Sequence, residues 1–132
     1  MKQNSKEPFP MPSVGVDVES IARFRHGDAC GPAFLKRVFL QSEIEYCERF
    51  SDPWPHFAGT FCAKEAVVKA AQSFFPLIVS NIEVGHRENR SPYIKSIVHG
   101  DQSVDHLLEI EVSISHCDEY AMACALIRKK EQ

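Results

Sequence analysis

Three short segments of the chain place polar side chains among apolar neighbours, and these residues are the candidates for chemistry. Asp17 stands between Val16 and Val18, Glu65 and Lys69 stand four apart among alanines, and His116 ends an alternating apolar stretch. A carboxylate in an apolar strand is costly unless a partner or a metal satisfies it. Asp17 is therefore either a metal ligand or a residue on a strand face that meets solvent.

The spacing of Glu65 and Lys69 brings their side chains together on one side of a helix. Such a pair is either an exposed ion pair or part of a surface that another group approaches closely, as the alanines beside Glu65 and Lys69 suggest. His116 is either a satisfied histidine at a sheet edge or a ligand group. The hydroxyls of Ser113 and Ser115 do not indicate a Ser-His-Asp triad, because the chain has no Gly-x-Ser-x-Gly elbow.

The elements that must position these residues follow from the sequence periodicity. The β-branched run Val14–Val18 predicts a first strand. A long helix that Asp52 and Pro53 open and Pro76 ends carries Glu65 and Lys69. Shorter helices are predicted over 19–25, 33–39 and 42–50, the last opened by a Ser42–Glu45 capping box. Period-2 alternation predicts strands over 82–84, 93–98, 110–114 and 120–127, so the fold class is α+β with a mostly antiparallel sheet.

Length and composition indicate one globular domain. The chain has 132 residues, of which 44% are hydrophobic and 25% charged. Residues 1–12 are predicted to be a flexible tail without the apolar region of a signal peptide, and 13–132 to be the domain. Without an apolar run long enough for a membrane span, the protein is predicted to be cytoplasmic. Five cysteines without a Cys-x-x-Cys pair indicate reduced thiols rather than disulfides or a zinc site.

Charge excludes one class of partner and suggests another. The net charge of −3 argues against nucleic acid, which usually binds to strongly basic domains. Residues 20–40 nevertheless hold four cations and one anion, a local charge of +3. This stretch, which includes Arg23 and Arg37, is either a solvated helix face or a surface for an acidic partner.

The candidate segments resemble those of one family when they are taken together. In chain order they are Gly15-x-Asp17, Phe61-Cys-Ala-Lys64-Glu65-Ala-x-x-Lys69-Ala70, and Ser113-Ile-Ser115-His116 followed by Tyr120-Ala-x-Ala123. This order is similar to the 4′-phosphopantetheinyl transferase superfamily, and most similar to its short holo-acyl-carrier-protein synthase type. The resemblance runs from Ser13 to Arg128.

The resemblance implies an enzyme that moves the phosphopantetheine arm of coenzyme A onto a serine of an apo acyl carrier protein. The second product would be adenosine 3′,5′-bisphosphate. Asp17 and Glu65 would bind Mg²⁺, and Glu65 would also accept the proton of the carrier serine. Lys69 would contact phosphate, Lys64 would be a further coenzyme A contact, and His116 would face the nucleotide phosphates.

The resemblance also implies partners and a fold. Arg23 and Arg37 would dock the acidic carrier protein, with fatty acid biosynthesis as one setting. The domain would be a small antiparallel sheet packed against a long helix. Short members of the family assemble as homotrimers with active sites between neighbouring copies, and the same is expected here.

Four departures from the family pattern concern the coenzyme A contacts. Thr60 stands where the family has an arginine, and Leu40 stands at a threonine position. The glycine-rich turn after Lys69 is missing, and the Asn-Gly-x-Pro turn carries Arg90 in place of its glycine. These changes leave a second hypothesis open, namely a non-catalytic module that binds carrier proteins and has lost coenzyme A.

Overall fold

The structure, a computed structural model, describes residues 11–131, so nearly all of the predicted tail of residues 1–12 lies outside the described part. One strand, four helices and then five strands follow one another along the domain: β1 Ser13–Ser20, α1 Ile21–His26, α2 Pro32–Val38, α3 Gln41–Glu48, α4 Trp54–Ala71, β2 Ile82–His86, β3 Pro92–His99, β4 Gln102–Ser103, β5 Leu108–His116 and β6 Tyr120–Lys129. Short 3₁₀ turns at Val79–Asn81 and Asp105–Leu107 precede β2 and β5.

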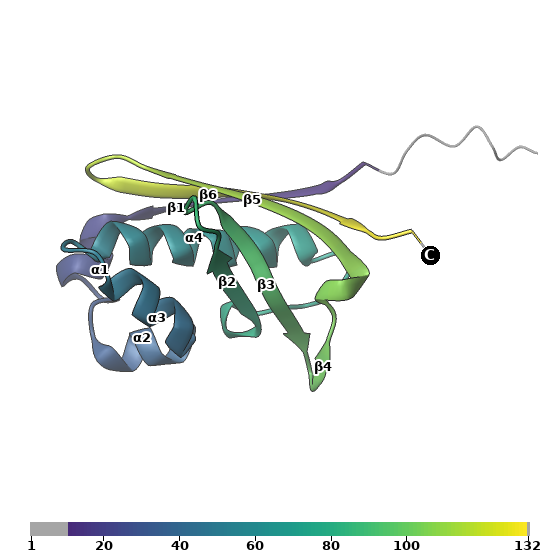
Figure 1. The fold of residues 1–132 in the computed structure, drawn as a ribbon, viewed down its shortest axis with the longest axis horizontal. Coiled ribbons are helices and arrows are strands. Elements are labelled where there is room, and N and C mark those ends of the chain that lie inside the picture. The colour runs from purple at the N-terminus through teal and green to yellow at the C-terminus, as the bar shows by residue number, and fades with distance from the viewer. Residues whose placement is uncertain (1–10, 132) are drawn as a thin grey trace, which may run out of the picture.

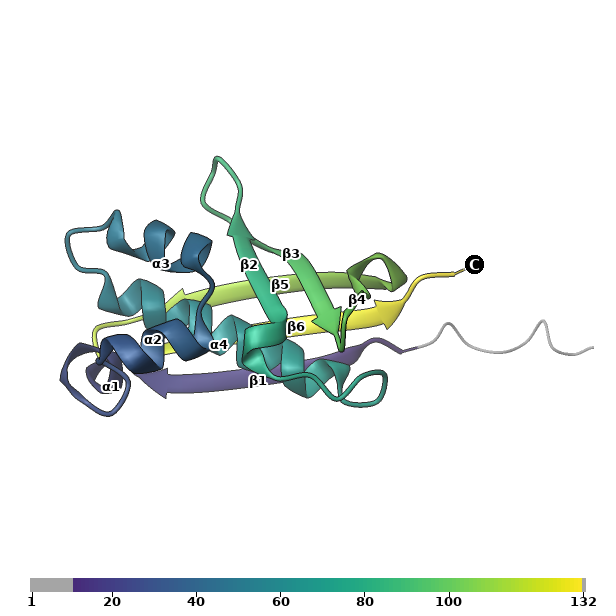
Figure 2. The same cartoon turned by 90° about the horizontal axis from the view of Figure 1, so that it is seen from below.

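Two antiparallel sheets enclose the long helix α4. The first sheet has the strand order β1-β6-β5 and the second has the order β2-β3-β4. Figure 1 shows α4 beneath the first sheet, with α1 to α3 and the second sheet on its other side. Seen from that side, β2 and β3 cross α4, and the loop between them stands clear of the body (Figure 2). The predicted α+β class, with an antiparallel sheet against a long helix, is confirmed.

Small residues let β1 pass directly over α4. Ala63, Ala66 and Ala70 are fully buried along the helix. A Cβ atom at Gly15 would lie 2.0 Å from the carbonyl oxygen of Ala66, so only glycine fits at this crossing. The close approach brings the next inward-facing residue of the strand, Asp17, against the same helix.

In β1 the apolar side chains face outward and the polar face lies against the helix, which is the reverse of a usual strand. The three valines share one face, as the sequence predicts, but that face is exposed: Val14, Val16 and Val18 have exposed fractions of 58%, 48% and 61%. The other face, which carries Gly15 and Asp17, lies against α4. Asp17 therefore does not lie on an open solvent face, and the alternative that it is a solvent-facing aspartate is wrong.

Two helix boundaries differ from those that the sequence predicts. The capping position of α3 is Leu40, and Glu43, not Glu45, reaches back to accept a hydrogen bond from the Leu40 amide (2.8 Å). Ser42 instead donates its hydroxyl to Glu83. Helix α4 ends at Ala71, five residues before Pro76, and the chain continues in turns in which the Phe74 and Phe75 amides both donate to the Ala71 carbonyl oxygen (2.8 Å).

No helix within residues 11–131 combines the length and the apolar character that a bilayer crossing needs.

Candidate active site

Asp17 and Lys69 meet where β1 crosses α4. The side chain of Asp17 is 11% exposed, and Lys69 Nζ donates to Asp17 Oδ1 at 3.1 Å and to the Val16 carbonyl oxygen at 2.9 Å. The other carboxylate oxygen, Asp17 Oδ2, is buried and has no hydrogen-bond partner. A buried carboxylate oxygen without a donor is costly, so this atom is suited to accept a cation.

Glu65 lies one helical turn before Lys69 and faces the same place. Burial, and then the negative charge of Asp17, raise the pKa of the Glu65 carboxyl, while the Lys69 ammonium opposes the rise. Glu65 therefore lies within electrostatic range of Asp17. The structure thus brings together three residues that the sequence singled out separately, Asp17, Glu65 and Lys69.

A third carboxylate, Glu19, belongs to the same place and was missed in the sequence. It lies two residues beyond Asp17 on the same face of β1, and its oxygen Oε1 accepts a hydrogen bond from Arg23 (2.7 Å). Burial, and then the nearby Asp17 carboxylate, raise the pKa of Glu19 to about 6. Glu19 could have been predicted as a neighbour of Asp17, because residues two apart in a strand lie on the same face. Asp17, Glu19, Glu65 and Lys69 are called the Asp17 cluster below.

The Asp17 cluster fits a hard cation that keeps other ligands of its own. Within residues 11–131, no three histidine, cysteine, aspartate or glutamate side chains are grouped so that they could hold a metal ion by themselves. Mg²⁺ typically takes only one or two carboxylates and completes its shell with water and substrate phosphates. The unpartnered Oδ2 of Asp17, with the Glu65 carboxylate beside it, matches that smaller requirement.

Lys64 lies in the interior instead of at the site. Its side chain has no exposed surface, and Nζ donates to the Val38 carbonyl oxygen (2.7 Å) and to the carboxylate of Glu43. The other oxygen of Glu43 accepts the Val84 amide at 2.7 Å. Burial lowers the pKa of Lys64. This position does not favour the predicted contact between Lys64 and coenzyme A: the lysine joins α4 to α3 and β2.

His116 lies in a separate cavity of about 180 Å³. This cavity is called the imidazole pocket, because His56, His86 and His116 line it together with Arg90. The rings of His56 and His116 are 6.0 Å apart.

The imidazole pocket and the Asp17 cluster are on different sides of the protomer. Asp17 pairs with Ala123, which in turn pairs with Ile114 of the pocket wall, so the two sites flank opposite edges of the three-stranded sheet. His56 and Glu65 are nine residues apart on α4, which is half a turn at about 100° per residue. One protomer therefore does not bring His116 to Asp17.

Arg23 and Arg37 gather around one aromatic ring. The guanidinium carbon of Arg23 lies 5.6 Å from the ring centre of Phe34, and that of Arg37 lies 5.7 Å from it. Arg23 also pairs with Glu19 and Asp28. The two arginines form one basic surface over α1 and α2, and Glu19 links that surface to the Asp17 cluster.

Comparison with known proteins agrees with this geometry. The profile of the 4′-phosphopantetheinyl transferase superfamily, of the holo-acyl-carrier-protein synthase kind, matches residues 13–125. The chain belongs to this superfamily. A holo-[acyl-carrier-protein] synthase from Thermodesulfovibrio yellowstonii is 37% identical over 115 residues, which cover 86% of this chain and 96% of that protein.

Solved structures of superfamily members have the same fold. A synthase from Chronobacterium ammoniagenes in complex with coenzyme A superposes with a TM-score of 0.74 at 25% identity, covering 92% of this chain and all of that one. The Helicobacter pylori synthase, also in complex with coenzyme A, gives a TM-score of 0.69 at 27% identity and covers 87% of this chain and 99% of that one.

Proposed function

We propose that the protein uses the Asp17 cluster for the Mg²⁺-dependent synthesis of holo acyl carrier protein. The enzyme transfers the 4′-phosphopantetheine group of coenzyme A to a serine of an apo acyl carrier protein and releases adenosine 3′,5′-bisphosphate. The observation that carries the metal assignment is the buried, unpartnered Oδ2 of Asp17 beside Glu65 and Lys69.

Asp17 and Glu65 are the residues that would hold Mg²⁺. When bound, the ion would neutralise charge on the pyrophosphate of coenzyme A and on the leaving phosphate. In the transfer the serine oxygen forms a bond to the phosphorus that carries pantetheine, and the bond from that phosphorus to the oxygen of the adenosine 5′-phosphate breaks. The oxygen leaves with its electron pair as adenosine 3′,5′-bisphosphate.

In this step Glu65 takes up the serine proton and Lys69 stabilises negative charge on the phosphate. Glu65 accepts the serine proton, directly or through one water, and its raised pKa brings it nearer to the range in which a carboxylate is an effective base. The Lys69 side chain is half exposed, so its ammonium can move from Asp17 to a phosphate oxygen of the substrate. There it stabilises the negative charge that develops as the leaving group departs.

The carrier protein is recognised by the basic surface of Arg23 and Arg37. Carrier proteins of fatty acid biosynthesis are acidic, and rim charges of this type chiefly speed the encounter. The hydrogen bond from Arg23 to Glu19, and the effect of Asp17 on Glu19, support a docking position next to the proposed reacting groups. A carrier serine docked there would enter beside Glu65.

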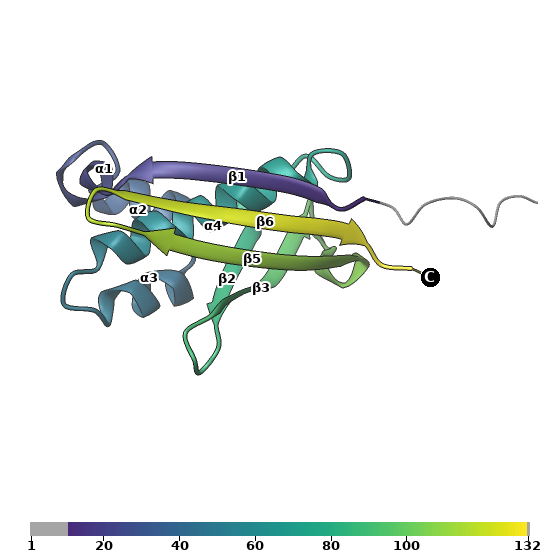
Figure 3. The ribbon, with the colours of Figure 1, turned by 90° about the horizontal axis from the view of Figure 1, so that it is seen from above.

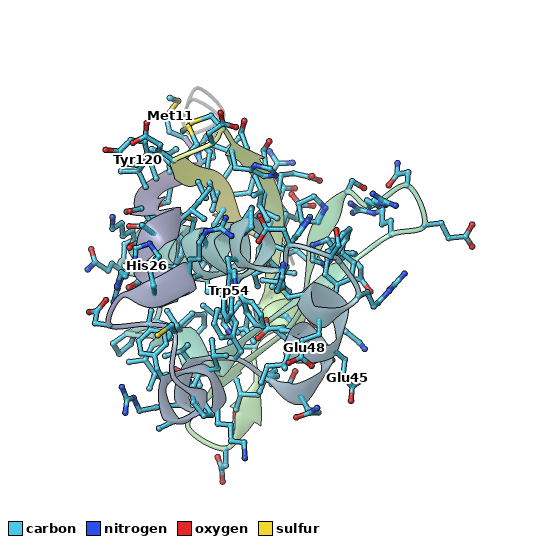
Figure 4. The ribbon with its side chains drawn as sticks, turned by 90° about the vertical axis from the view of Figure 1, so that its left-hand side faces the viewer. Met11, His26, Glu45, Glu48, Trp54 and Tyr120 are labelled. Atoms are coloured by element: carbon cyan, nitrogen blue, oxygen red, sulfur yellow. The ribbon has the colours of Figure 1, made fainter. Side chains whose placement is uncertain are left out.

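We also propose that three copies share the outer face of the first sheet. No helix covers this face in the described part of the chain (Figure 3), and Tyr120 lies on the side away from α4 (Figure 4). Its exposed apolar side chains are Val14, Val16, Val18, Tyr120, Met122 and Leu126, with exposed fractions between 44% and 61%. A contiguous apolar patch of this kind favours a protein partner, and further copies of the chain are the occupants that the family resemblance implies.

Assembly would complete the active site. The Asp17 cluster and the imidazole pocket flank opposite edges of the sheet in one protomer, so contact between two copies could align one with the other. The nucleotide would then lie across the boundary between copies. The five free cysteines are compatible with the reducing cytoplasm, in which we place the enzyme.

A transfer assay with a matched pair of variants tests the proposed chemistry. The purified protein, Mg²⁺, coenzyme A and apo acyl carrier protein are mixed, and the carrier mass is followed. Glu65→Gln keeps the side-chain size and removes the charge, so we expect the rate to fall by roughly 100-fold or more. Glu48→Gln makes the same change at an exposed position on α3, outside the cluster (Glu48 is labelled in Figure 4), and should keep the full rate. Full activity of the Glu65 variant would contradict the proposal.

A further inference from the structure

The guanidinium of Arg23 lies against three aromatic rings. Its central carbon is 5.7, 5.6 and 5.4 Å from the ring centres of Phe24, Phe34 and Phe61. The rings also pack on one another, with centroid distances between 5.5 and 6.2 Å, and Phe24 has no exposed surface. Because aromatic faces attract a cation, the guanidinium is already fixed in the protein alone.

Two carboxylates of the chain itself bind this guanidinium, and they differ in exposure. Glu19 accepts a hydrogen bond from Nη1 at 2.7 Å, and Asp28 accepts one from Nε at 2.9 Å through its oxygen Oδ1. The Glu19 side chain is 16% exposed, whereas that of Asp28 is 75% exposed. Of the two, Asp28 is therefore the carboxylate that an acidic partner can reach and replace.

The turn after α1 holds Asp28 against Arg23. The amides of Gly27 and Ala29 both donate to the Arg23 carbonyl oxygen at 3.1 Å. A Cβ atom at Gly27 would lie 2.8 Å from the Arg23 Cα atom, so the turn can close this tightly only with glycine. The Ala29 side chain is fully buried. The contact between Asp28 and Arg23 is thus fixed by the path of the backbone, and two flexible surface side chains would not be held in this way.

Asp28 reduces the charge of the surface that is proposed to meet the carrier protein. Residues 20–40 hold four cations, and Asp28 is the one anion among them. It occupies the Nε side of Arg23, the cation that also binds Glu19. A partner carboxylate can bind a guanidinium through two parallel hydrogen bonds, which together are stronger than the bond from Nε to Asp28. An acidic side chain of suitable geometry can therefore take the place of Asp28.

We propose that Asp28 is an internal competitor of the acyl carrier protein for Arg23. The inference rests on the proposed function. In the free enzyme Asp28 covers the Nε side of the guanidinium. When the carrier docks, one of its acidic side chains displaces Asp28 into solvent, while Glu19 and the aromatic rings keep Arg23 in place. Asp28 thereby sets the KM for the carrier and discriminates against proteins whose acidic side chains cannot form the stronger pair.

Steady-state transfer with varied concentrations of apo acyl carrier protein tests this competition. Asp28→Asn keeps the shape of the side chain and removes its charge, so KM for the carrier should fall by roughly two- to fivefold, the factor that an exposed ion pair contributes. The kcat should stay unchanged, because Asp28 pairs with Arg23, which takes no part in the transfer step. Fluorescence anisotropy of labelled apo carrier, measured without coenzyme A, should show the dissociation constant fall by the same factor.

Two controls separate the competition from a general change of charge. Asp52→Asn removes the same charge from the other arginine of α1, Arg25, which Asp52 binds through both oxygens (2.9 and 3.0 Å), and it should leave KM for the carrier unchanged. Arg23→Gln removes the cation and keeps a long side chain. In that background Asp28→Asn should no longer lower KM, because the effect of Asp28 depends on its partner.

The outcomes for Asp28 and for the transferase are distinguishable. The proposal is overturned by a KM and a dissociation constant that stay the same in Asp28→Asn. It is also overturned by a fall that appears equally in Asp52→Asn or that persists in the Arg23→Gln background. Each of these results leaves the transferase activity standing. Absence of transfer from the unchanged protein would instead refute the proposed function, and the anisotropy measurement would then decide the role of Asp28 by itself.

Discussion

Helix α4 carries two lysine–carboxylate pairs that differ in almost every physical respect. The pair of Lys64 and Glu43 is fully buried, with both side chains at 0% exposure, whereas the pair of Lys69 and Asp17 lies at the surface with Lys69 50% exposed. The two lysines are five residues apart, which turns them about 140° from each other around the helix. The Lys64–Glu43 pair joins α4, α3 and β2, whereas the Lys69–Asp17 pair leaves its lysine free to move to a substrate.

This difference shows that the role of a charged residue in a motif depends on which side of its helix is covered by other elements. Both lysines belong to the segment Lys64-Glu65-Ala-x-x-Lys69, and both were expected to contact coenzyme A. The helix is enclosed by two sheets and three shorter helices, so most of its circumference is interior. Of the two lysines, only Lys69 lies on a side of α4 that is open to a ligand.

The largest effect on stability is expected from Lys64→Met. Removing one partner of a buried ion pair leaves the Glu43 carboxylate without compensation, which costs about 3–5 kcal/mol of the free energy of unfolding. Urea denaturation at a fixed protein concentration measures this loss. A loss below about 1 kcal/mol would show that the pair does not hold α3, α4 and β2 together.

The same substitution at Lys69 should separate activity from stability. Lys69→Met removes an ion pair whose lysine is half exposed, so the free energy of unfolding should fall by clearly less than in Lys64→Met. The rate of transfer to the carrier should fall by roughly 100-fold, because developing charge on the leaving phosphate loses its cation. A variant that keeps its rate, or that loses as much stability as Lys64→Met, would erase the distinction between the two pairs.

The elements were predictable because their signals are local. Alternation located the strands, and proline with small residues located α4. Three features depended on contacts between elements and could not be predicted from one segment. They are the exposed side of β1, which only the crossing at Gly15 decides, the participation of Glu19, and the interior position of Lys64.

Two departures from the family pattern gain a physical account from the structure. Leu40, at the threonine position, is the capping residue of α3 and offers no side-chain acceptor, so Glu43 alone reaches back to satisfy the first amide. Arg90, at the glycine position, keeps the positive φ that a glycine would adopt freely. The first removes a stabilising contact, whereas the second adds a cation to a pocket.

The central claim is that the enzyme works only when copies meet across the exposed face of the first sheet, and one measurement tests it directly. Met122 lies on the central strand β6, is 44% exposed on that face and touches no proposed catalytic residue. Met122→Lys should leave the circular dichroism spectrum unchanged, convert the proposed trimer to monomers in sedimentation, and reduce transfer to the carrier by roughly 100-fold, because three buried ammonium groups cannot be accommodated in an apolar interface. Glu48→Lys is the matched control and should stay trimeric and active. A Met122→Lys monomer with the full transfer rate would contradict the account.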